Sequence, residues 1–324
     1  MHTFKQLTEI VKSLFDQEEF TGSPSQLYEP IAYTLADGGK RIRPVLLLAA
    51  NELFDGDIET ARNAAIGIET FHNFTLLHDD LMDRSPVRRG KQTVYLKWND
   101  NTAILSGDAM NILAWRYFLR TPHPNLHSIL QTFEKTSMEI CEGQQYDMNF
   151  ESRNDVSIDE YMEMIRLKTA VLLGCALKIG ALYANANESD IDHIYDFGIG
   201  IGLAFQLRDD LLDAYGDTKT FGKQTGTDIR DNKKTYLFLR ALEKASKNQR
   251  TRLLQLFATT PDNADNKIKE VLKIYDSLNI KAEVESEIAR LHQQAMQNLE
   301  CIDRPNDKKQ TIFEIAQKLL NRNV

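Results

Sequence analysis

The octapeptide LLHDDLMD spans Leu76–Asp83, and a closely similar one, QLRDDLLD, spans Gln206–Asp213. Each contains Asp-Asp-Leu-x-Asp within a largely apolar segment. Residues three and four apart are neighbours on an α-helix, with Cβ atoms ~5–6 Å apart. Each octapeptide therefore predicts a helix with three carboxylates crowded on one face. These carboxylates are Asp79, Asp80 and Asp83 in the first cluster and Asp209, Asp210 and Asp213 in the second.

Three like charges at this spacing destabilise a helix unless positive charge is supplied. Carboxylates without His or Cys favour Mg²⁺, which takes one or two carboxylates together with waters and phosphate oxygens. A single cluster is equally compatible with a solvated acidic surface, but two copies favour a metal-binding pair. A helix-loop-helix calcium site is excluded, because neither cluster has the loop glycine or the Glu at the twelfth position.

Basic segments that contain glycine lie next to both clusters and near the N-terminus. They are GGKRIRP at 38–44, RSPVRRGK at 84–91, and GKQTGTD at 222–228 with NKKT at 232–235. Arg binds phosphate oxygens through paired hydrogen bonds and Lys supplies a compact charge, while glycine lets the backbone approach closely. Each segment alone fits a solvated turn. Together with the acidic clusters, they indicate a site for a metal-bridged diphosphate.

Helical periodicity dominates the rest of the chain. Leu7, Val11 and Leu14 form one apolar stripe, and few runs alternate as strands do, so the predicted fold class is all-α. Polar or Pro-containing breaks are expected at 21–24, 121–124, 151–157, 259–266 and 303–309. None is long enough to be an interdomain linker, which predicts a single domain over residues 1–324.

The net charge is −8, from 39 Lys and Arg and 47 Asp and Glu. An acidic chain argues against nucleic acid as a partner and against a protein that coats an anionic membrane. No run approaches the ~20 apolar residues of a membrane span, so no stable membrane insertion is expected. Three scattered cysteines predict reduced thiols in a cytoplasmic protein. The run Gly198–Gly202 lacks dinucleotide-binding spacing and is interpreted as close helix packing.

Six segments in order, between Gly38 and Thr235, resemble the trans-type polyprenyl diphosphate synthase family, which includes farnesyl and geranylgeranyl diphosphate synthases. They are GGKRIRP, FHNFTLLHDDLMDRSPVRRGKQT, LSGDAM, EGQQYDM, RLKTA, and GLAFQLRDDLLDAYGD with GKQTGTDIRDNKKT. The resemblance implies an all-α isoprenoid synthase helical bundle around a deep central cavity, usually homodimeric. It also implies a magnesium-dependent prenyltransferase of isoprenoid biosynthesis. Such an enzyme condenses isopentenyl diphosphate with allylic prenyl diphosphates by metal-assisted ionisation.

The resemblance assigns roles to individual residues. Both Asp clusters would hold about three Mg²⁺ ions on the allylic diphosphate. The side chains that would contact the same diphosphate are Arg88, Lys168, Lys223 and Lys233. The isopentenyl diphosphate pocket would consist of Gly39, Lys40, Arg43, His72 and Arg89. Thr169 and Gln206 would face the developing allylic cation. Without the resemblance, His72 fits a core or surface histidine better than a ligand-binding one.

This chain departs from the family pattern at three loop positions. Gln92 and Tyr95 stand where Pro and His are usual, and Asn232 replaces a usual Gly before Lys233. Asn tolerates a left-handed backbone better than most residues, so the loop at Asn232 is expected to keep its shape. None of the three is a predicted metal ligand.

The residues before the first cluster bear on product length, because in the family a bulky side chain there limits the cavity. Phe74 lies five residues before Asp79 and is followed by the small Thr75. This arrangement is most similar to the geranylgeranyl (C20) pattern. Phe71 adds bulk one turn earlier and leaves farnesyl (C15) open. By geometry alone Phe74 lies ~140° around the helix from Asp79 and fits a core residue as well.

Two other functions fit parts of the sequence. A class I terpene cyclase shares the first aspartate motif, but it has a different second metal motif and does not need GGKRIRP. A non-catalytic subunit of a heteromeric prenyl synthase typically lacks one or both Asp clusters. Both clusters are intact here, which favours an active synthase.

Overall fold

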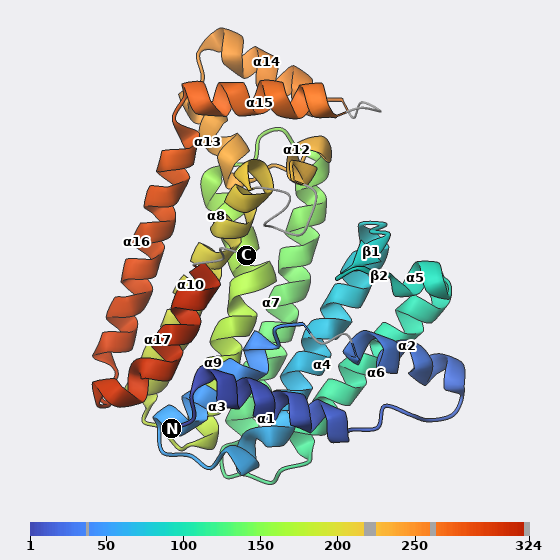
Figure 1. The fold of residues 1–324 in the computed structure, drawn as a ribbon, viewed down its shortest axis with the longest axis vertical. Coiled ribbons are helices and arrows are strands. Elements are labelled where there is room, and N and C mark those ends of the chain that lie inside the picture. The colour runs from blue at the N-terminus through green and yellow to red at the C-terminus, as the bar shows by residue number, and fades with distance from the viewer. Residues whose placement is uncertain (37–38, 217–224, 260–263, 321–324) are drawn as a thin grey trace. The chain divides into compact units, whose positions relative to one another are not determined.

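The computed structural model describes residues 1–36, 39–216, 225–259 and 264–320. Helices form almost all of their regular structure (Figure 1), which confirms the predicted all-α class. The chain divides into two compact units. The first contains residues 1–132, 176–192 and 303–315, and the second contains 133–175, 193–302 and the C-terminal residues from Ala316.

The first unit begins with helices and contains one short hairpin. Its own elements are α1 (Phe4–Gln17), α2 (Ser25–Leu35), α3 (Ile42–Leu53), α4 (Ile58–Met82), β1 (Val87–Arg88), β2 (Lys91–Gln92), α5 (Val94–Lys97) and α6 (Asp100–Leu119). Helix α4 packs against α3 and α6 (Figure 1). Small residues allow this approach, since a Cβ on Gly67 would lie only 3.1 Å from the Ala114 carbonyl oxygen of α6.

Among the described residues of the second unit, all regular structure is helical. Its own elements are α8 (Ile158–Ile165), the π-helical turn η1 (Arg166–Ala170), α12 (Thr227–Arg230), α13 (Tyr236–Lys244), α14 (Lys247–Phe257), α15 (Asp265–Ser277) and α16 (Ile280–Cys301). Several helices contribute residues to both units, namely α7 (Leu126–Ser152), α9 (Val171–Tyr183), α10 (Glu188–Tyr215) and α17 (Asn306–Leu320). Within the described ranges, no helix is long and apolar enough to cross a membrane.

The π-helical turn η1 is enclosed by two glycines. A Cβ on Gly143 of α7 would collide with the Lys168 backbone nitrogen, and one on Gly202 of α10 would lie 2.6 Å from the Ala170 Cα. A Cβ on Gly200 would likewise meet Ala295 of α16 at 2.8 Å. The interpretation of the glycine run as close helix packing is therefore confirmed at Gly200 and Gly202. Single π turns often occur at functional sites.

The predicted breaks match the helix ends closely in the first half of the chain. Residues 21–24 separate α1 from α2, and 121–124 separate α6 from α7. The predicted break at 303–309 is too long, because α17 begins at Asn306. Residues 260–263 of another break lie outside the described residues. The hairpin was not predicted: Val87 pairs with Gln92, and Arg89 and Gly90 both have positive φ, 51° and 79°, as a tight two-residue hairpin turn requires.

Candidate active site

The first Asp cluster lies at the C-terminal end of α4. Asp79 and Asp80 belong to its last turn, and Asp83 is the exposed C-cap residue, whose N–H donates to the Asp79 carbonyl at 2.8 Å. The predicted crowding of three carboxylates on one helix is thus observed, and the structure places it at the end of α4. Burial, with the charges of Asp79 and Asp83 adding to it, raises the pKa of Asp80 to about 6 despite the nearby Arg88.

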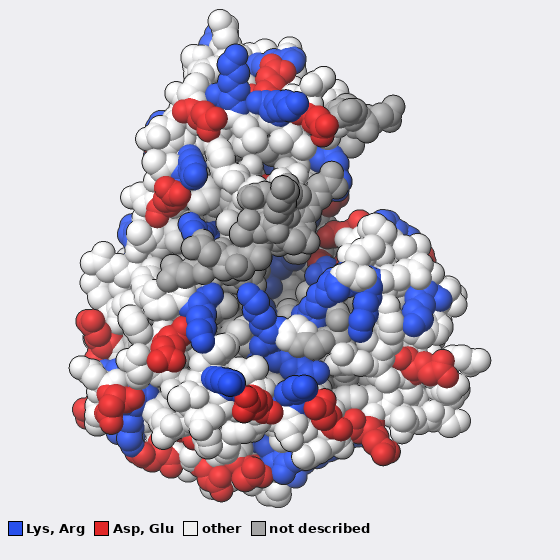
Figure 2. All heavy atoms as spheres, in the orientation of Figure 1, with Lys and Arg blue, Asp and Glu red and all other residues white. Residues whose placement is uncertain are grey.

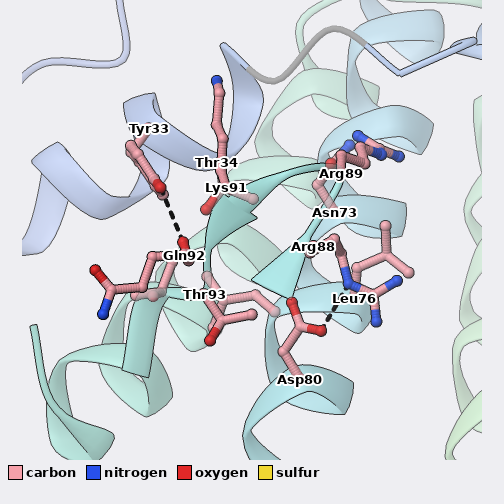
Figure 3. Close-up of a pocket in the computed structure, with 12 residues that line it drawn as sticks. Tyr33, Thr34, Asn73, Leu76, Asp80, Arg88, Arg89, Lys91, Gln92 and Thr93 are labelled. Atoms are coloured by element: carbon pink, nitrogen blue, oxygen red, sulfur yellow. Dashed lines mark hydrogen bonds and ion pairs between the residues drawn. The ribbon is translucent and has the colours of Figure 1, made fainter. Parts of the chain in front are cut away.

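Arg88 is the cation that meets this cluster. Its Nε donates to Asp80 Oδ1 at 2.7 Å and its Nη2 to Asp79 Oδ2 at 3.4 Å. The hairpin that carries Arg88 is pinned to the end of α4, because the Ser85 N–H donates to the Asp80 carbonyl and Thr93 Oγ1 donates to the Ser85 carbonyl. Figure 3 shows Asp80 and Arg88 with Arg89 around a small pocket of about 40 Å³ between α2, α4 and the hairpin.

Residues predicted to bind isopentenyl diphosphate lie in contact in pairs. A Cβ on Gly39 would lie 2.7 Å from the guanidinium carbon of Arg89, so these residues touch. Arg43 Nη1 lies 3.0 Å from His72 Nε2. Desolvation of the ring, followed by the charges of Arg43 and Arg89, holds the pKa of His72 well below 6.5. The neutral ring therefore accepts a hydrogen bond from Arg43.

Lys40, which follows Gly39 in the sequence, is exposed. Figure 2 shows Lys and Arg side chains gathered on the face of the first unit where α2, α3 and α4 lie. This concentration of positive charge contrasts with the acidic chain as a whole, and it suits an anionic ligand.

Glu69 is a residue of this region that the sequence analysis missed. It is buried on α4, one turn before His72, and its Oε1 accepts a hydrogen bond from Asn73 at 3.1 Å. Desolvation raises its pKa, and the charges of Arg43, Arg89 and Arg41 oppose that rise. Glu69 thus provides a counter-charge behind the arginines. The only signal in the sequence was an acidic residue directly after the apolar run at 64–68.

The residues predicted to limit product length lie on the same helix. Phe71 is fully buried, whereas Phe74 is partly exposed, and their ring centroids are 5.4 Å apart. Thr75 is half-buried and donates its hydroxyl hydrogen to the His72 carbonyl. The Phe74 ring also meets His78 edge-on at 4.8 Å. Phe71 is therefore a core residue that supports Phe74, the more accessible of the two rings.

The second Asp cluster lies near the C-terminal end of α10 and belongs to a buried hydrogen-bond network. Gln206 Nε2 donates to Asp210 Oδ1 at 3.0 Å, and Thr169 Oγ1 donates to Gln206 Oε1 at 3.1 Å. The hydroxyl of buried Tyr161 donates to the other Asp210 oxygen. Burial raises the pKa of Asp210 to about 7, although these donors lower it. Asp209, the first residue of the cluster, is half-buried.

Asp213, the last residue of this cluster, has a different environment from its two neighbours. Its Oδ1 accepts from the N–H and hydroxyl of Thr227, and its Oδ2 accepts from the Asp228 N–H at 3.0 Å. Asp213 thus anchors the first turn of α12. Desolvation, followed by the charges of Asp213 and Asp210, raises the pKa of Asp228 well above its usual value.

Two lysines predicted to bind the allylic diphosphate, Lys168 and Lys233, line a larger pocket of about 380 Å³ in the second unit. Thr169, Gln206, Asp210 and Asp228 also line it. Lys168 Nζ donates to Asp147 Oδ2 at 2.7 Å. Burial of Asp147 acts to raise its pKa, but the charges of Lys168 and Lys233 outweigh burial and lower the pKa. Lys223 lies outside the described residues.

Three residues of this second pocket were not assigned a role from the sequence. Asp147 and Asp228 stand in segments that were recognised, EGQQYDM and GKQTGTD, but without a stated function. Tyr161 gave no signal, because a tyrosine on an amphipathic helix is ordinarily a core residue. Its importance comes only from its contact with Asp210.

The donor sets at both pockets fit a hard divalent cation. They consist of carboxylates, and a cation would offset the repulsion and desolvation that raise the pKa values of Asp80 and Asp210. Across the described part of the chain, no three His, Cys, Asp or Glu side chains form a complete metal site.

Comparison with known proteins gives one consistent result. The polyprenyl synthetase family matches residues 24–275. A short chain isoprenyl diphosphate synthase of Methanothermobacter thermautotrophicus is 35% identical over 301 residues, which are 93% of this chain and 91% of that protein. A geranylfarnesyl diphosphate synthase of Natronomonas pharaonis is 39% identical over 72% of this chain and 74% of its own length.

Solved structures agree with the sequence comparisons. A crystal structure of a geranylgeranyl pyrophosphate synthase is similar with a TM-score of 0.95 and 42% identity, and the match covers 100% of both chains. The fold and the order of elements are therefore shared over the full length.

Proposed function

The chain belongs to the polyprenyl synthetase family and is a short-chain trans-prenyltransferase, and on that premise we propose how its residues divide the reaction. The observation that carries the proposal is that each Asp cluster lies with cationic side chains at a pocket of its own unit. Asp80 lies with Arg88 and Arg89 at the first pocket, and Asp210 lies with Lys168 and Lys233 at the second.

We propose that both Asp clusters serve one allylic diphosphate and that Arg88, Lys168 and Lys233 bind its oxygens. When bound, Mg²⁺ neutralises the charge that develops on the departing diphosphate. Arg88 and Lys168 are balanced by Asp79, Asp80 and Asp147. These pairs hold the cations in place without leaving buried charge uncompensated. Lys223 is assigned to the same diphosphate from the family pattern.

Isopentenyl diphosphate is assigned to Gly39, Lys40, Arg43, His72 and Arg89. The contact of Gly39 with the Arg89 guanidinium supports this assignment, because a side chain at position 39 would displace the guanidinium. The neutral His72 ring orients Arg43 by accepting its hydrogen bond. Guanidinium groups fixed in this way match the two-pronged geometry of phosphate oxygens.

The chemical step needs no protein nucleophile. The allylic C–O bond breaks and its electron pair leaves with the pyrophosphate. The double bond of isopentenyl diphosphate attacks the resulting allylic cation, a C–C bond forms, and a proton is lost to the pyrophosphate. Thr169 and Gln206 are assigned to the stabilisation of that cation. Their mutual hydrogen bond, with Gln206 bound in turn to Asp210, supports this role because it orients the amide.

The product is proposed to be geranylgeranyl diphosphate (C20). Phe74 is partly exposed at the fifth position before Asp79, and Thr75 beside it is small. The relatives support a short-chain product, since their names include geranylgeranyl and geranylfarnesyl diphosphate synthases.

We further propose that both units act as one polyprenyl synthase domain and that the protein is a homodimer. The single family match includes residues of both units, which supports one domain. Three apolar residues of α6 spaced by seven, Leu105, Ile112 and Leu119, are 60%, 66% and 57% exposed. An apolar stripe of this kind suits a second copy of the chain, and sedimentation of Ile112→Glu against wild type tests that partner.

The decisive experiment incubates the purified chain with Mg²⁺, isopentenyl diphosphate and a C5, C10 or C15 allylic diphosphate, and then sizes the products. We expect C20 to accumulate from every starter, and EDTA to abolish turnover. A hydrocarbon formed from one prenyl diphosphate without isopentenyl diphosphate would instead indicate a cyclase. Protein that is inert alone but alters another synthase would indicate a non-catalytic subunit.

A further inference from the structure

Lys267 is a buried lysine of α15 that none of the assigned roles includes. It is 4% exposed, and its ammonium group donates to three oxygens. These are the Arg230 carbonyl at 3.2 Å, the Thr259 carbonyl at 3.0 Å and the Asn232 side-chain carbonyl. A lysine ammonium has three hydrogens, so each has an acceptor. Burial of this charge is costly unless it is compensated in this way.

Two of the acceptors belong to the segment that lines the second pocket. Arg230 is the last residue of α12, and Asn232 directly precedes Lys233. The Lys233 N–H donates back to the Asp228 carbonyl at 2.9 Å. Residues 229–232 therefore link Asp228 to Lys233, and both of these side chains line the pocket. Whatever fixes residues 230–232 also fixes the two charged groups on either side.

The residue after Lys267 holds the opposite end of α12. A Cβ on Gly226, the N-cap residue of α12, would lie 2.8 Å from Ile268 Cδ1. Gly226 also has a φ of 79°, which other residues rarely adopt. Helix α15 thus contacts α12 at its beginning through Ile268 and at its end through Lys267.

Asn232 connects this arrangement to a feature peculiar to the chain. It has a φ of 62°, so the expectation of a left-handed backbone at this position is confirmed. Its amide oxygen is one of the three acceptors of Lys267. A glycine would adopt the same backbone conformation, but it would not supply this acceptor.

We propose that Lys267 is a positioning residue for the transfer reaction, which holds Asp228 and Lys233 at the pocket through residues 230–232. The side chain of Asn232 provides one of the hydrogen bonds through which Lys267 holds residues 230–232. The inference rests on the proposed function, because the contacts of Lys267 with residues 230–232 are expected to affect binding and release of the diphosphate. Lys267 itself touches no substrate in this account.

The test compares Lys267→Met with Lys269→Met, a matched change at an exposed position of the same helix. Displacement of reacting groups by ~1 Å costs up to about 10²-fold in rate. We expect Lys267→Met to lower kcat by about 10- to 100-fold and to weaken Mg²⁺-dependent binding of inorganic pyrophosphate, measured by calorimetry. The KM for isopentenyl diphosphate should stay unchanged, since its cations belong to the first unit. Lys267→Arg, which keeps donors on a long stem, should recover part of kcat.

Asn232→Gly provides a second variant should Lys267→Met fold poorly. It should lower kcat by a few-fold in the wild-type background and have a smaller effect when Lys267 is already Met, because the two residues share one contact. The inference would be overturned if folded Lys267→Met and Lys269→Met had equal kcat, KM and pyrophosphate affinity. It would also be overturned if the effects of Lys267→Met and Asn232→Gly on kcat were strictly multiplicative. Wild-type protein without condensation activity would instead refute the proposed function.

Discussion

The two Asp-Asp-Leu-x-Asp clusters have the same sequence pattern and different surroundings. The first lies at a helix end, where Arg88 meets two of its carboxylates and Asp83 is exposed. The second is largely buried, where Tyr161 and Gln206 donate to Asp210 and where Asp213 anchors α12. Asp80 of the first cluster is paired with a charge, whereas Asp210 of the second accepts from neutral hydrogen-bond donors.

This difference teaches that a repeated motif does not imply equivalent residues. In the first cluster the third Asp is exposed, whereas in the second the third Asp accepts hydrogen bonds from the backbone of α12. We therefore expect corresponding substitutions in the two clusters to have different effects on stability and on rate.

The largest expected effect is on the rate, from Asp79→Ala. This change removes a ligand for the cation that neutralises the leaving group, so kcat should fall by about 10³-fold or more, with little change in Tm because the residue is at a helix end. Steady-state kinetics and thermal unfolding measure the two quantities. Asp209→Ala is the matched change in the second cluster, and a near-normal rate in either variant would contradict the assigned metal role.

The next effect separates the third residues of the clusters. Asp213→Ala leaves the N–H groups of Thr227 and Asp228 without their acceptor and should cost about 1–2 kcal/mol of unfolding free energy. Asp83→Ala removes an exposed carboxylate and should change stability by less than about 0.5 kcal/mol. Urea denaturation of the apo protein compares them directly. Equal losses would show that Asp213 does not anchor α12.

Tyr161→Phe tests the neutral donors of the second cluster. Loss of one hydrogen bond to a carboxylate should cost about 1 kcal/mol and lower the rate near pH 7 several-fold. The pKa of Asp210, about 7 with the donors present, should rise, because the hydroxyl stabilises the charged form. The acidic limb of the kcat/KM profile should therefore move to higher pH. An unshifted limb with an unchanged rate would exclude this contribution.

The smallest effect on rate is expected from Phe74→Ala, which changes the product instead. Phe74 stands five residues before Asp79, whereas the corresponding residue before Asp209 is the buried Ala204, so only the first cluster has a bulky group at this place. Removal of the ring should shift the products beyond C20, as chromatography of the dephosphorylated alcohols would show. Phe71→Leu is the control in the core, and unchanged products from Phe74→Ala would remove Phe74 from the account of chain length.

The sequence was sufficient for the fold class and for the residues in the two clusters. Helical spacing predicted that Asp79 and Asp80 lie on one helix, which the structure confirms. The interpretation of Gly202 as a packing residue is confirmed by its contact with Ala170. The spacing of the aspartates is local in the sequence, and a glycine at a close helix contact is indicated by its residue type alone.

What the sequence could not supply are contacts between residues far apart in the chain. Tyr161 meets Asp210 across 49 positions, and Lys267 meets Asn232 across 35. Neither Tyr161 nor Lys267 belongs to a motif. Burial of Lys267 also runs against the ordinary preference of lysine for the surface. The hairpin at Arg88 was missed because each of its strands has only two residues, too few for any alternation to be visible.

The π-helical turn at Arg166–Ala170 makes the number of residues in this segment as important as their identity. A π turn contains one residue more than an α turn closed at the same height. Deleting one residue from it would restore regular α spacing, but it would also rotate Lys168 or its neighbours by about 100° relative to α9. A point substitution of the half-buried Arg166 is thus expected to be tolerated better than a single-codon deletion. Natural relatives aligned across this segment should keep its length even where its residues change.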